Sequence, residues 1–200
     1  MLIATMARKS TRKKIAPGAA PSAPAGEQTL LDSAAVDQAL NRIGKQIAAN
    51  LPAEGVVALI GLRSRGDELA RRLIGGLRKT RPDLCHGTLD ITLYRDDLSK
   101  RAVQPTVRAT EIDFNLDGAF VILVDDVLNT GRTIRAAMDA LMDYGRPAVI
   151  RLAVLVDRGG RELPIAPDFV GAQLDLPADD PRRVYFELAE TDGRDRVYLK

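Results

Sequence analysis

Apolar residues recur at helical spacing in two segments of the first half of the chain. One set consists of Val36, Leu40, Ile43 and Ile47, and the other of Leu69, Leu73, Ile74 and Leu77. Intervals of three and four residues place side chains on one face of an α-helix, so each segment predicts a helix packed on a core. Between them lies GVVALIGLRSRG, a β-rich run that predicts a buried strand ending in a basic turn flanked by glycine.

Strand signals dominate the second half. The segment TLDITLYRDDL alternates Leu89, Ile91 and Leu93 with polar residues, which predicts a half-exposed strand. The runs AFVILV and AVIRLAVLV predict buried strands. A helix is predicted between these two strands, and the YGRP that follows it contains glycine and proline as stop signals. Its apolar face consists of Ile134, Met138 and Leu141.

Helix and strand signals alternate along the body of the chain. This order predicts one α/β domain over residues 29–200, built on a parallel twisted sheet flanked by helices. Ligands of such sheets bind at the carboxyl ends of the strands. Residues 99–113 are polar and weakly patterned, so we expect a mobile loop there. The chain beyond Asp157 predicts loops and short strands.

Composition narrows the class of protein. The 200 residues are 46% hydrophobic and 28% charged, which is ordinary for a soluble globular domain. The single Cys85 excludes an intramolecular disulfide and suits a reducing compartment, so we expect a cytoplasmic protein. The single His86 excludes a multi-histidine metal site. No apolar run approaches the roughly 20 residues that span a membrane, and we expect no membrane partner.

Charge is distributed unevenly. Residues 1–28 contain five basic residues and one acid and are rich in Ala, Pro and Gly, so we expect a disordered tail. An organelle-targeting segment and an alternative start at Met6 are other interpretations of this segment. The remaining body has 24 basic and 26 acidic residues, a net charge of −2, so a nucleic-acid partner would need a local basic patch.

The stretch VILVDDVLNTGRT places Asp125 and Asp126 at the end of an apolar strand. The loop that follows contains Gly131, which permits positive φ, and the hydroxyls of Thr130 and Thr133. At a helix N-terminus, such a loop can form a nest of N–H groups for a phosphate. Acceptors for sugar hydroxyls and donors for a phosphate thus lie side by side, which suits a phosphorylated ribose. Alternatively, Asp126 or Thr130 only caps the helix while Asp125 is solvated.

The same stretch resembles the phosphoribosyl-pyrophosphate (PRPP) motif of type I phosphoribosyltransferases. Further blocks resemble the PyrR family of pyrimidine-operon attenuation proteins and uracil phosphoribosyltransferases: GLRSRGDELARRL, GTLDITLYRDDL, TGRTIRAAMDALMDYGRP and LAVLVDRGGRELPIAPDFVG. The resemblance covers roughly residues 30–171 well and continues weakly to residue 200. It implies a Rossmann-like core with a small β-rich hood and a flexible loop.

The resemblance also implies an activity, the transfer of ribose 5-phosphate from PRPP to uracil, which gives UMP and pyrophosphate with Mg²⁺ as cofactor. The implied catalytic residues are Asp125 and Asp126, near the ribose and the Mg²⁺ carried by PRPP, and Arg63 and Arg65, which stabilise the leaving pyrophosphate. The other residues implied to bind PRPP or UMP are Leu62, Ser64, Tyr94, Arg95, Val127, Leu128, Asn129, Thr130, Gly131, Arg132, Thr133, Asp157 and Arg158.

Several of these positions carry a more detailed expectation. The turn of residues 62–65 is implied to hold pyrophosphate, with its first peptide bond cis, and a solvated basic turn is the alternative. Arg95 is expected to reach the phosphates, or else to form a surface ion pair with Asp96 or Asp97. The loop of residues 99–108 is expected to close over the site and exclude water. Uracil is expected beside Asp157 and Arg158, recognised largely by backbone groups.

Three departures from the family pattern stand out. Asn129 occupies a position where the family usually has an aromatic residue, and Gly160 one where it usually has a histidine. The stretch LDLPADDPRR brings three acids into a segment that is usually polar and basic. Phosphate binding should tolerate Asn129. The acids oppose binding to an RNA backbone, so the other two changes weaken the expectation of RNA regulation more than that of catalysis.

Two principal functions are therefore expected, and they are compatible in one protein. One is a uracil phosphoribosyltransferase. The other is an RNA-binding attenuator that senses UMP or UTP in the same pocket and binds the pyr leader mRNA. A type I transferase for a purine or for orotate is a further alternative. By resemblance, a homodimer or a homotetramer is expected.

Overall fold

The computed structural model describes residues 14–15, 26–95, 109–174, 176–177 and 179–200. Its strands are β1 (Lys14–Ile15), β2 (Gln28–Leu31), β3 (Val57–Leu62), β4 (Cys85–Leu89), β5 (Phe120–Leu128), β6 (Val149–Asp157), β7 (Phe169–Leu174), β8 (Val184–Glu187) and β9 (Arg196–Leu199). Its helices are α1 (Ser33–Ala48), α2 (Gly66–Leu77), the 3-10 helix η1 (Thr92–Tyr94), α3 (Arg132–Leu141) and α4 (Ala189–Asp192).

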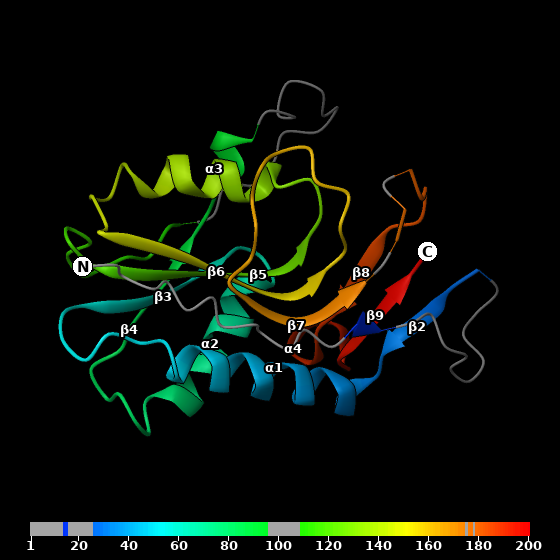
Figure 1. Cartoon of the computed structure of the whole chain (residues 1–200), viewed down its shortest axis with the longest axis horizontal. Helices are drawn as coiled ribbons and strands as arrows, with labels where there is room; N and C mark the ends of the chain where they lie inside the picture. The colour runs from blue at the N-terminus through cyan, green and yellow to red at the C-terminus, as the bar shows by residue number, and fades with distance from the viewer. Residues whose placement is uncertain (1–13, 16–25, 96–108, 175, 178) are drawn as a thin grey trace, which may run out of the picture.

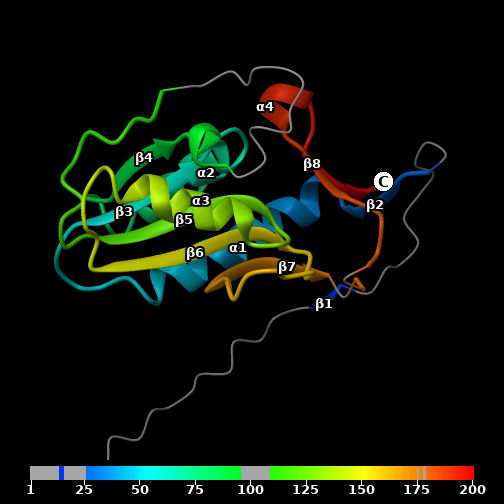
Figure 2. The same cartoon turned by 90° about the horizontal axis from the view of Figure 1, so that it is seen from above.

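Two sheets organise these elements. The larger is wholly parallel, with the strand order β1-β7-β6-β5-β3-β4, and the smaller is antiparallel, with the order β2-β9-β8. Helices α1 and α2 cover one face of the large sheet, and α3 covers the other (Figure 1). The small sheet lies at one end of the large sheet (Figure 2), beside the carboxyl ends of β5 and β6. The predicted fold, a parallel α/β sheet with a β-rich hood, is confirmed.

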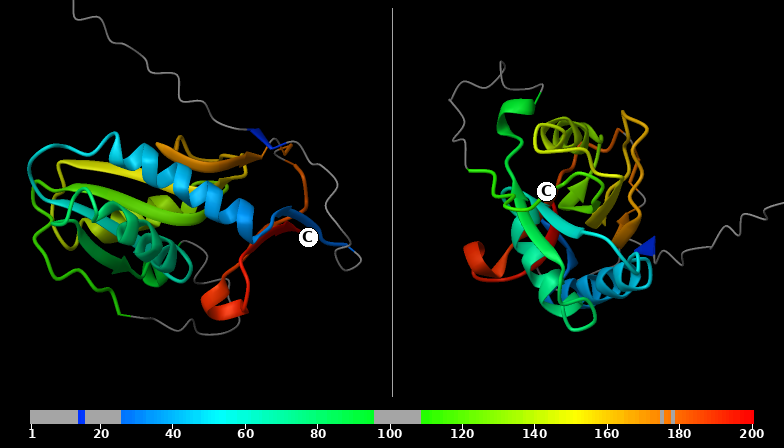
Figure 3. Two further views of the ribbon diagram at one scale, coloured as in Figure 1. Left: turned by 90° about the horizontal axis from the view of Figure 1, so that it is seen from below. Right: turned by 90° about the vertical axis from the view of Figure 1, so that its left-hand side faces the viewer.

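The apolar patterns predicted the long helices correctly. All four predicted core residues of α1 and all four of α2 are buried. Asp32 caps α1, since its Oδ1 accepts a hydrogen bond from the N–H of Ala35 at 2.8 Å. The two helices lie next to each other under the sheet (Figure 3). Strand β3 is buried at every position because helices cover both faces of the sheet.

Two strand ends differ from the sequence-based expectation. The predicted strand over TLDITLYRDDL is wrong beyond Leu89, where β4 ends. The Oδ1 of Asp90 accepts from the N–H of Thr92 at 2.8 Å, and this turn leads into η1 and leaves Leu93 65% exposed. Strand β5, by contrast, continues through both acids to Leu128, because it stays paired with β6 as far as Asp157.

Two predicted segments lie mostly outside the described residues. Of the expected tail, only residues 14–15 and 26–28 are described, and β1 pairs in parallel with Gln173 and Leu174 of β7. Of the expected mobile loop, residues 109–113 are described, and Glu111 forms an antiparallel bridge with Thr88. Among the described helices, none has the length and apolar character needed to cross a membrane.

Candidate active site

The turn between β3 and α2 approaches β5 closely because it is bounded by glycines. A Cβ on Gly66 would stand 2.3 Å from the carbonyl oxygen of Val124 and 3.1 Å from the Cα of Asp125. A Cβ on Gly61 would stand 2.3 Å from the Cα of Asp67. Only glycine permits such contacts, so these two residues bring the basic turn up to the acids. The cis peptide joins Arg63 to Ser64, one bond later than the sequence suggested.

Asp125 and Asp126 form a tightly placed acid pair on β5. Asp125 is 8% exposed, so the alternative of a solvated side chain is wrong. Burial, reinforced by the charge of Asp126, holds the pKa of Asp125 well above its ordinary value, and the positive charge of Arg95 acts against this shift. Burial also raises the pKa of Asp126, although a hydrogen bond from Val127 and the charge of Arg65 oppose it. An added positive charge would therefore favour the ionised pair.

The loop after β5 has the form of an anion site. Gly131 adopts φ +93°, and α3 begins at the next residue. The Oγ1 of Thr130 accepts from the N–H of Arg132 at 3.3 Å and closes a local turn. The N-cap of α3 is Gly131, which has no side chain to cap it, so the alternative in which Thr130 serves as the helix cap is wrong. The carbonyl oxygen of Thr130 accepts from the N–H groups of Glu162 and Leu163 at 3.0 and 3.1 Å. These bonds fix the loop while the N-terminus of α3 can receive an anion.

The chain after β6 lies against this loop. The N–H of Arg158 donates to the carbonyl oxygen of Leu128 at 2.9 Å. The Oδ1 of Asp157 accepts from Nη2 of Arg161 at 2.6 Å, and Nη1 of Arg161 donates to the carbonyl oxygen of Asn129 at 2.7 Å. Arg161 was not among the predicted site residues, although it belongs to the block LAVLVDRGGRELPIAPDFVG. It joins the two segments that flank the expected base position.

Arg158 joins the core to the segment that leads into β8 of the hood, which is the small sheet β2-β9-β8. It is 5% exposed, and its Nη2 donates to the carbonyl oxygens of Asp180 and Arg182 at 2.7 and 3.0 Å. A cavity of about 510 Å³ lies here, with both segments in its wall. Its lining residues are Val127, Asn129, Thr130, Arg158, Gly160, Glu162, Asp180, Pro181, Arg182, Arg183 and Val184. Four predicted site residues are among them, and the cavity is large enough for part of a nucleotide.

All three departures from the family pattern meet at this cavity. The Oδ1 of Asn129 accepts from Nη1 of Arg158 at 3.2 Å. A Cβ on Gly160 would stand 2.9 Å from the Oδ1 of Asn129 and 3.0 Å from Nη1 of Arg158. The backbone of Asp180, within the acidic stretch, receives the other end of the same guanidinium. The departures are thus one connected set of contacts around Arg158.

The arginines of the basic turn face carboxylates from two other parts of the chain. Nη2 of Arg63 lies 2.8 Å from Oε1 of Glu111, and Nη2 of Arg65 lies 3.3 Å from Oδ2 of Asp192. The side chain of Arg63 is 18% exposed, so the alternative of a solvated basic turn does not describe it, whereas the side chain of Arg65 is 39% exposed and Ser64 between them is exposed. The Nε atoms of both arginines are buried and have no hydrogen-bond partner among the described residues. No local pattern in the sequence pointed to Glu111 or Asp192.

The remaining predicted residues lie at varying distances from the anion loop and the acid pair. Leu62 and Leu128 are buried strand ends, and Thr133 lies in the first turn of α3. The hydroxyl of Tyr94 donates to Asp143, beyond the C-terminal end of α3. Because α3 is about 15 Å long, this hydroxyl is far from the anion loop. Asp96, Asp97 and the expected closing loop lie outside the described residues.

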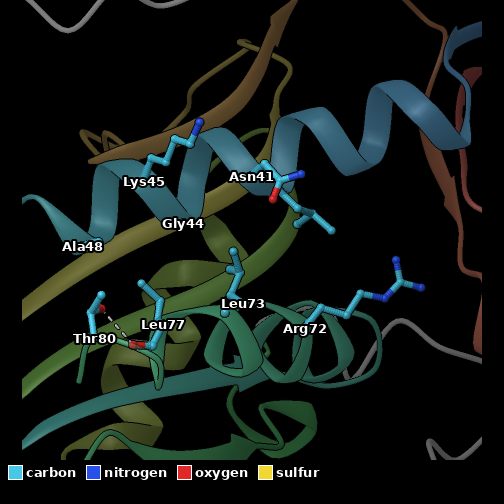
Figure 4. Close-up of a pocket in the computed structure, with 10 residues that line it drawn as sticks. Asn41, Gly44, Lys45, Ala48, Arg72, Leu73, Leu77 and Thr80 are labelled. Atoms are coloured by element: carbon cyan, nitrogen blue, oxygen red, sulfur yellow. Dashed lines mark hydrogen bonds between the residues drawn. The ribbon is translucent and has the colours of Figure 1, made fainter. Parts of the chain in front are cut away.

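A second cavity, of about 260 Å³, lies between α1 and α2 (Figure 4). Its wall includes Gly44, Ala48 and Leu73, and Figure 4 also shows the Oγ1 of Thr80 donating to the carbonyl oxygen of Leu77, at 3.0 Å. None of the predicted site residues lines this cavity. We therefore place the candidate site at the carboxyl ends of β3, β5 and β6.

The donor set fits Mg²⁺ only with help from a ligand. Across the described part of the chain, no group of three or more His, Cys, Asp or Glu side chains could hold a metal ion. Asp125 and Asp126 alone provide two carboxylates with raised pKa values. Mg²⁺ is commonly bound by one or two carboxylates together with substrate phosphates, and this pair meets that requirement.

Comparisons with known proteins show the family and the fold of the chain. Residues 27–182 match the phosphoribosyl transferase domain family. The chain is 45% identical over 176 residues to the bifunctional protein PyrR of Akkermansia muciniphila, covering 88% of this chain and 97% of that protein. It is 51% identical over 169 residues to the bifunctional protein PyrR of a Roseiflexus species, covering 84% and 91%. The hypoxanthine phosphoribosyltransferase of Trypanosoma cruzi matches with a TM-score of 0.63 and 20% identity, covering 86% of this chain and 95% of that one, which shows a shared fold.

Proposed function

The chain belongs to the PyrR family of phosphoribosyltransferases, and we propose that it makes UMP and pyrophosphate from uracil and PRPP at the site described above. The observation that carries this proposal is the acid pair Asp125 and Asp126 between an anion loop and a basic turn. That order matches the order of groups in PRPP, which has a 5′-phosphate, a ribose and a diphosphate.

The proposed mechanism assigns each group one task. The loop of residues 129–133 and the N-terminus of α3 bind the 5′-phosphate. Asp125 and Asp126 accept hydrogen bonds from the ribose hydroxyls and favour the positive charge that develops on the sugar as its bond to pyrophosphate breaks. Arg63 and Arg65 stabilise the departing negative charge. Bound Mg²⁺ would supply further charge stabilisation to the diphosphate, with the two acids nearby.

The base is proposed to lie between Asp157 and the hood. Arg158 fixes the hood backbone at Asp180 and Arg182, and Arg161 fixes Asp157. These bonds keep the base pocket in a defined shape without a strong general base, which agrees with a chain that has a single histidine. The carbonyl and N–H groups of uracil would meet mainly backbone atoms here.

A steady-state assay tests the proposal. Purified protein with Mg²⁺, PRPP and uracil should form UMP and pyrophosphate, and the double variant Asp125→Asn, Asp126→Asn should lose most of this activity. Wild-type rates in the double variant would overturn the site assignment. Competition by hypoxanthine, guanine and orotate tests the choice of base, since none of the three should suppress UMP formation if uracil is the preferred substrate.

A second activity is proposed alongside transfer, because the PyrR relatives are named bifunctional. We propose that UMP bound in this site promotes binding to a pyrimidine-operon leader RNA. The pairing of Arg182 with Asp180 at 2.7 Å reduces the free positive charge beside the cavity. Nucleotide-dependent RNA binding in a gel-shift or fluorescence assay supports the second activity, and sequence-blind association contradicts it.

A further inference from the structure

Asp192 and Glu111, the two carboxylates that pair with the arginines of the basic turn, are held very differently. Asp192 is fixed by its own turn, because its Oδ2 accepts from the N–H of Leu188 at 2.8 Å and from the hydroxyl of Thr191 at 3.1 Å. The side chain of Glu111 is 68% exposed, and among the described residues Arg63 is the one cation within ion-pair distance of it. Glu111 is therefore the carboxylate that can leave its arginine at little cost.

The backbone of Glu111 is held by its own hydrogen bonds, independently of its side chain. Its N–H donates to the carbonyl oxygen of Thr88 at 2.8 Å, and its carbonyl oxygen accepts from the N–H of Thr88 at 2.9 Å. Gly87 allows this close approach, since a Cβ there would stand 3.0 Å from the same carbonyl oxygen. The departure of the carboxylate needs only side-chain rotation.

Arg63 has a second hydrogen-bond partner besides Glu111. Its Nη2 also donates to the Oγ1 of Thr88 at 3.0 Å, and its side chain is only 18% exposed. Its Nε is buried and has no acceptor among the described residues. A guanidinium has five N–H donors in a fixed plane and binds phosphate oxygens through charge-assisted bonds, which are stronger than an exposed ion pair.

Building on the proposed function, we propose that Glu111 is a positioning residue for the diphosphate. In the ligand-free protein it occupies the place on Arg63 that an oxygen of PRPP or pyrophosphate takes on binding. When the ligand arrives, Glu111 gives up the arginine, and when pyrophosphate leaves, it takes the arginine back. Glu111 thus weakens diphosphate binding and assists product release.

The variant Glu111→Gln tests this exchange, because it removes the charge and keeps the size of the side chain. We expect the KM for PRPP and the inhibition constant for pyrophosphate to fall about two- to fivefold, the range set by the loss of one exposed ion pair. We expect no increase in kcat. An unchanged or raised KM for PRPP would overturn the proposal.

Asp83→Asn is a matched control. The pair of Arg81 and Asp83 has side-chain exposures of 16% and 62%, close to the 18% and 68% of Arg63 and Glu111, and it lies outside the site. This variant should leave both constants unchanged. A fall of equal size in the control would show that net charge, and not the contact with Arg63, sets the affinity.

A double-mutant cycle of binding affinities distinguishes competition for Arg63 from general charge repulsion between Glu111 and the diphosphate. Calorimetric binding of Mg²⁺–pyrophosphate is measured for the wild type, Glu111→Gln, Arg63→Ala and the double variant. The gain from Glu111→Gln should disappear in the Arg63→Ala background, and a gain of full size there would refute the proposal. If the wild-type protein binds neither pyrophosphate nor PRPP, the proposed function is refuted. If the wild type binds them normally and Glu111→Gln gives no gain in affinity, only the role of Glu111 is refuted.

Discussion

Asn129 and Gly160 are coupled at the scale of single atoms. The missing side chain of Gly160 leaves room for the Oδ1 of Asn129, which would lie 2.9 Å from a Cβ at that position. That same oxygen accepts from Arg158, the residue that ties the core to the hood. A residue with a Cβ at position 160 would need a different side chain or rotamer at position 129, so the two departures depend on each other.

This coupling predicts non-additive stability. Gly160→Ala should lower the free energy of unfolding by about 1–2 kcal/mol from its φ of +71°, with a further cost from the contact with Asn129. Adding Asn129→Ala removes the oxygen, so the double variant should recover about 0.5 kcal/mol or more relative to additivity. Chemical denaturation measures the free energy of unfolding of the wild type, the two single variants and the double variant.

Gly118→Ala is the control for that cycle. Gly118 has a φ of +73°, and no atom lies within 4 Å of the point where a Cβ would stand, so it carries the backbone cost alone. Its combination with Asn129→Ala should be additive. Additive behaviour at Gly160 as well would contradict the coupling.

The acid pair gives a prediction for pH. Because burial raises the pKa of Asp125 above its ordinary 3.8, the folded protein binds this proton more tightly than the unfolded chain does. Its stabilising contribution is full below the unfolded pKa and is lost as pH rises through the folded pKa. Asp125→Asn should therefore raise the free energy of unfolding near neutral pH, by on the order of 1 kcal/mol, while it lowers the rate of transfer.

Denaturant unfolding of the ligand-free protein at about pH 5 and about pH 8 tests the sign. The gain from Asp125→Asn should be larger at the higher pH, where the wild-type pair is more fully ionised. A gain that shrinks as pH rises would mean that the carboxylate is stabilised in its charged form.

At the scale of elements, one arginine clamps the C-terminal turn to helix α2. Nη1 and Nη2 of Arg72 donate to both carboxylate oxygens of Asp195, at 2.7 and 3.0 Å, and its Nε donates to Glu190 at 2.9 Å. The Oδ1 of Asp195 also accepts from the N–H of Ala189 at 2.8 Å. This cluster fixes α4, which in turn carries the Asp192 that faces Arg65.

Asp195→Asn should loosen that clamp. Burial alone would raise the pKa of Asp195, but hydrogen bonds from Arg72 and Ala189 hold it below its ordinary value, so the charged form is the one that stabilises the fold. The loss should be about 1–3 kcal/mol above the unfolded pKa and should diminish as pH falls through the folded pKa. Chemical denaturation measures it, with Asp139→Asn as a control. Asp139 pairs with Arg135 on the surface of α3, where a loss of about 0.5 kcal/mol or less is expected.

The elements also show what a sequence can predict. Helices α1 and α2 were predictable because apolar residues spaced three and four positions apart lie on one buried face of each helix. The acid pair and the loop after it could be identified together because they are contiguous in the sequence. The parallel pairing of Leu128 with Asp157 then places the expected base position beside them. The end of β4 was not predictable, because one side-chain hydrogen bond to Asp90 decides it. Glu111 and Asp192 lie 48 and 127 residues from their arginines, so only the folded chain reveals them.

At the scale of the whole molecule, the distribution of charge separates the two activities. The net charge of the chain is +2, but the body from residue 29 onward carries −2, so all of the excess positive charge belongs to the N-terminal segment. Transfer depends on local contacts at the ends of β3, β5 and β6, which are insensitive to distant charge. RNA association depends on the number of phosphates neutralised, and its affinity falls as salt rises.

Removal of residues 1–13 should therefore affect the two activities differently. The truncation removes Arg8, Lys9, Arg12 and Lys13 and keeps the two residues of β1. We expect the kcat and KM of UMP formation to stay unchanged. The slope of log K for leader RNA against log salt should become shallower by as much as about 3, since each single-strand phosphate contact contributes roughly 0.7. A full-length variant with these four residues changed to Gln separates charge from length, because it should match the truncation if charge alone is responsible. An unchanged slope in both variants would place the RNA contacts on the body of the protein, despite its net negative charge.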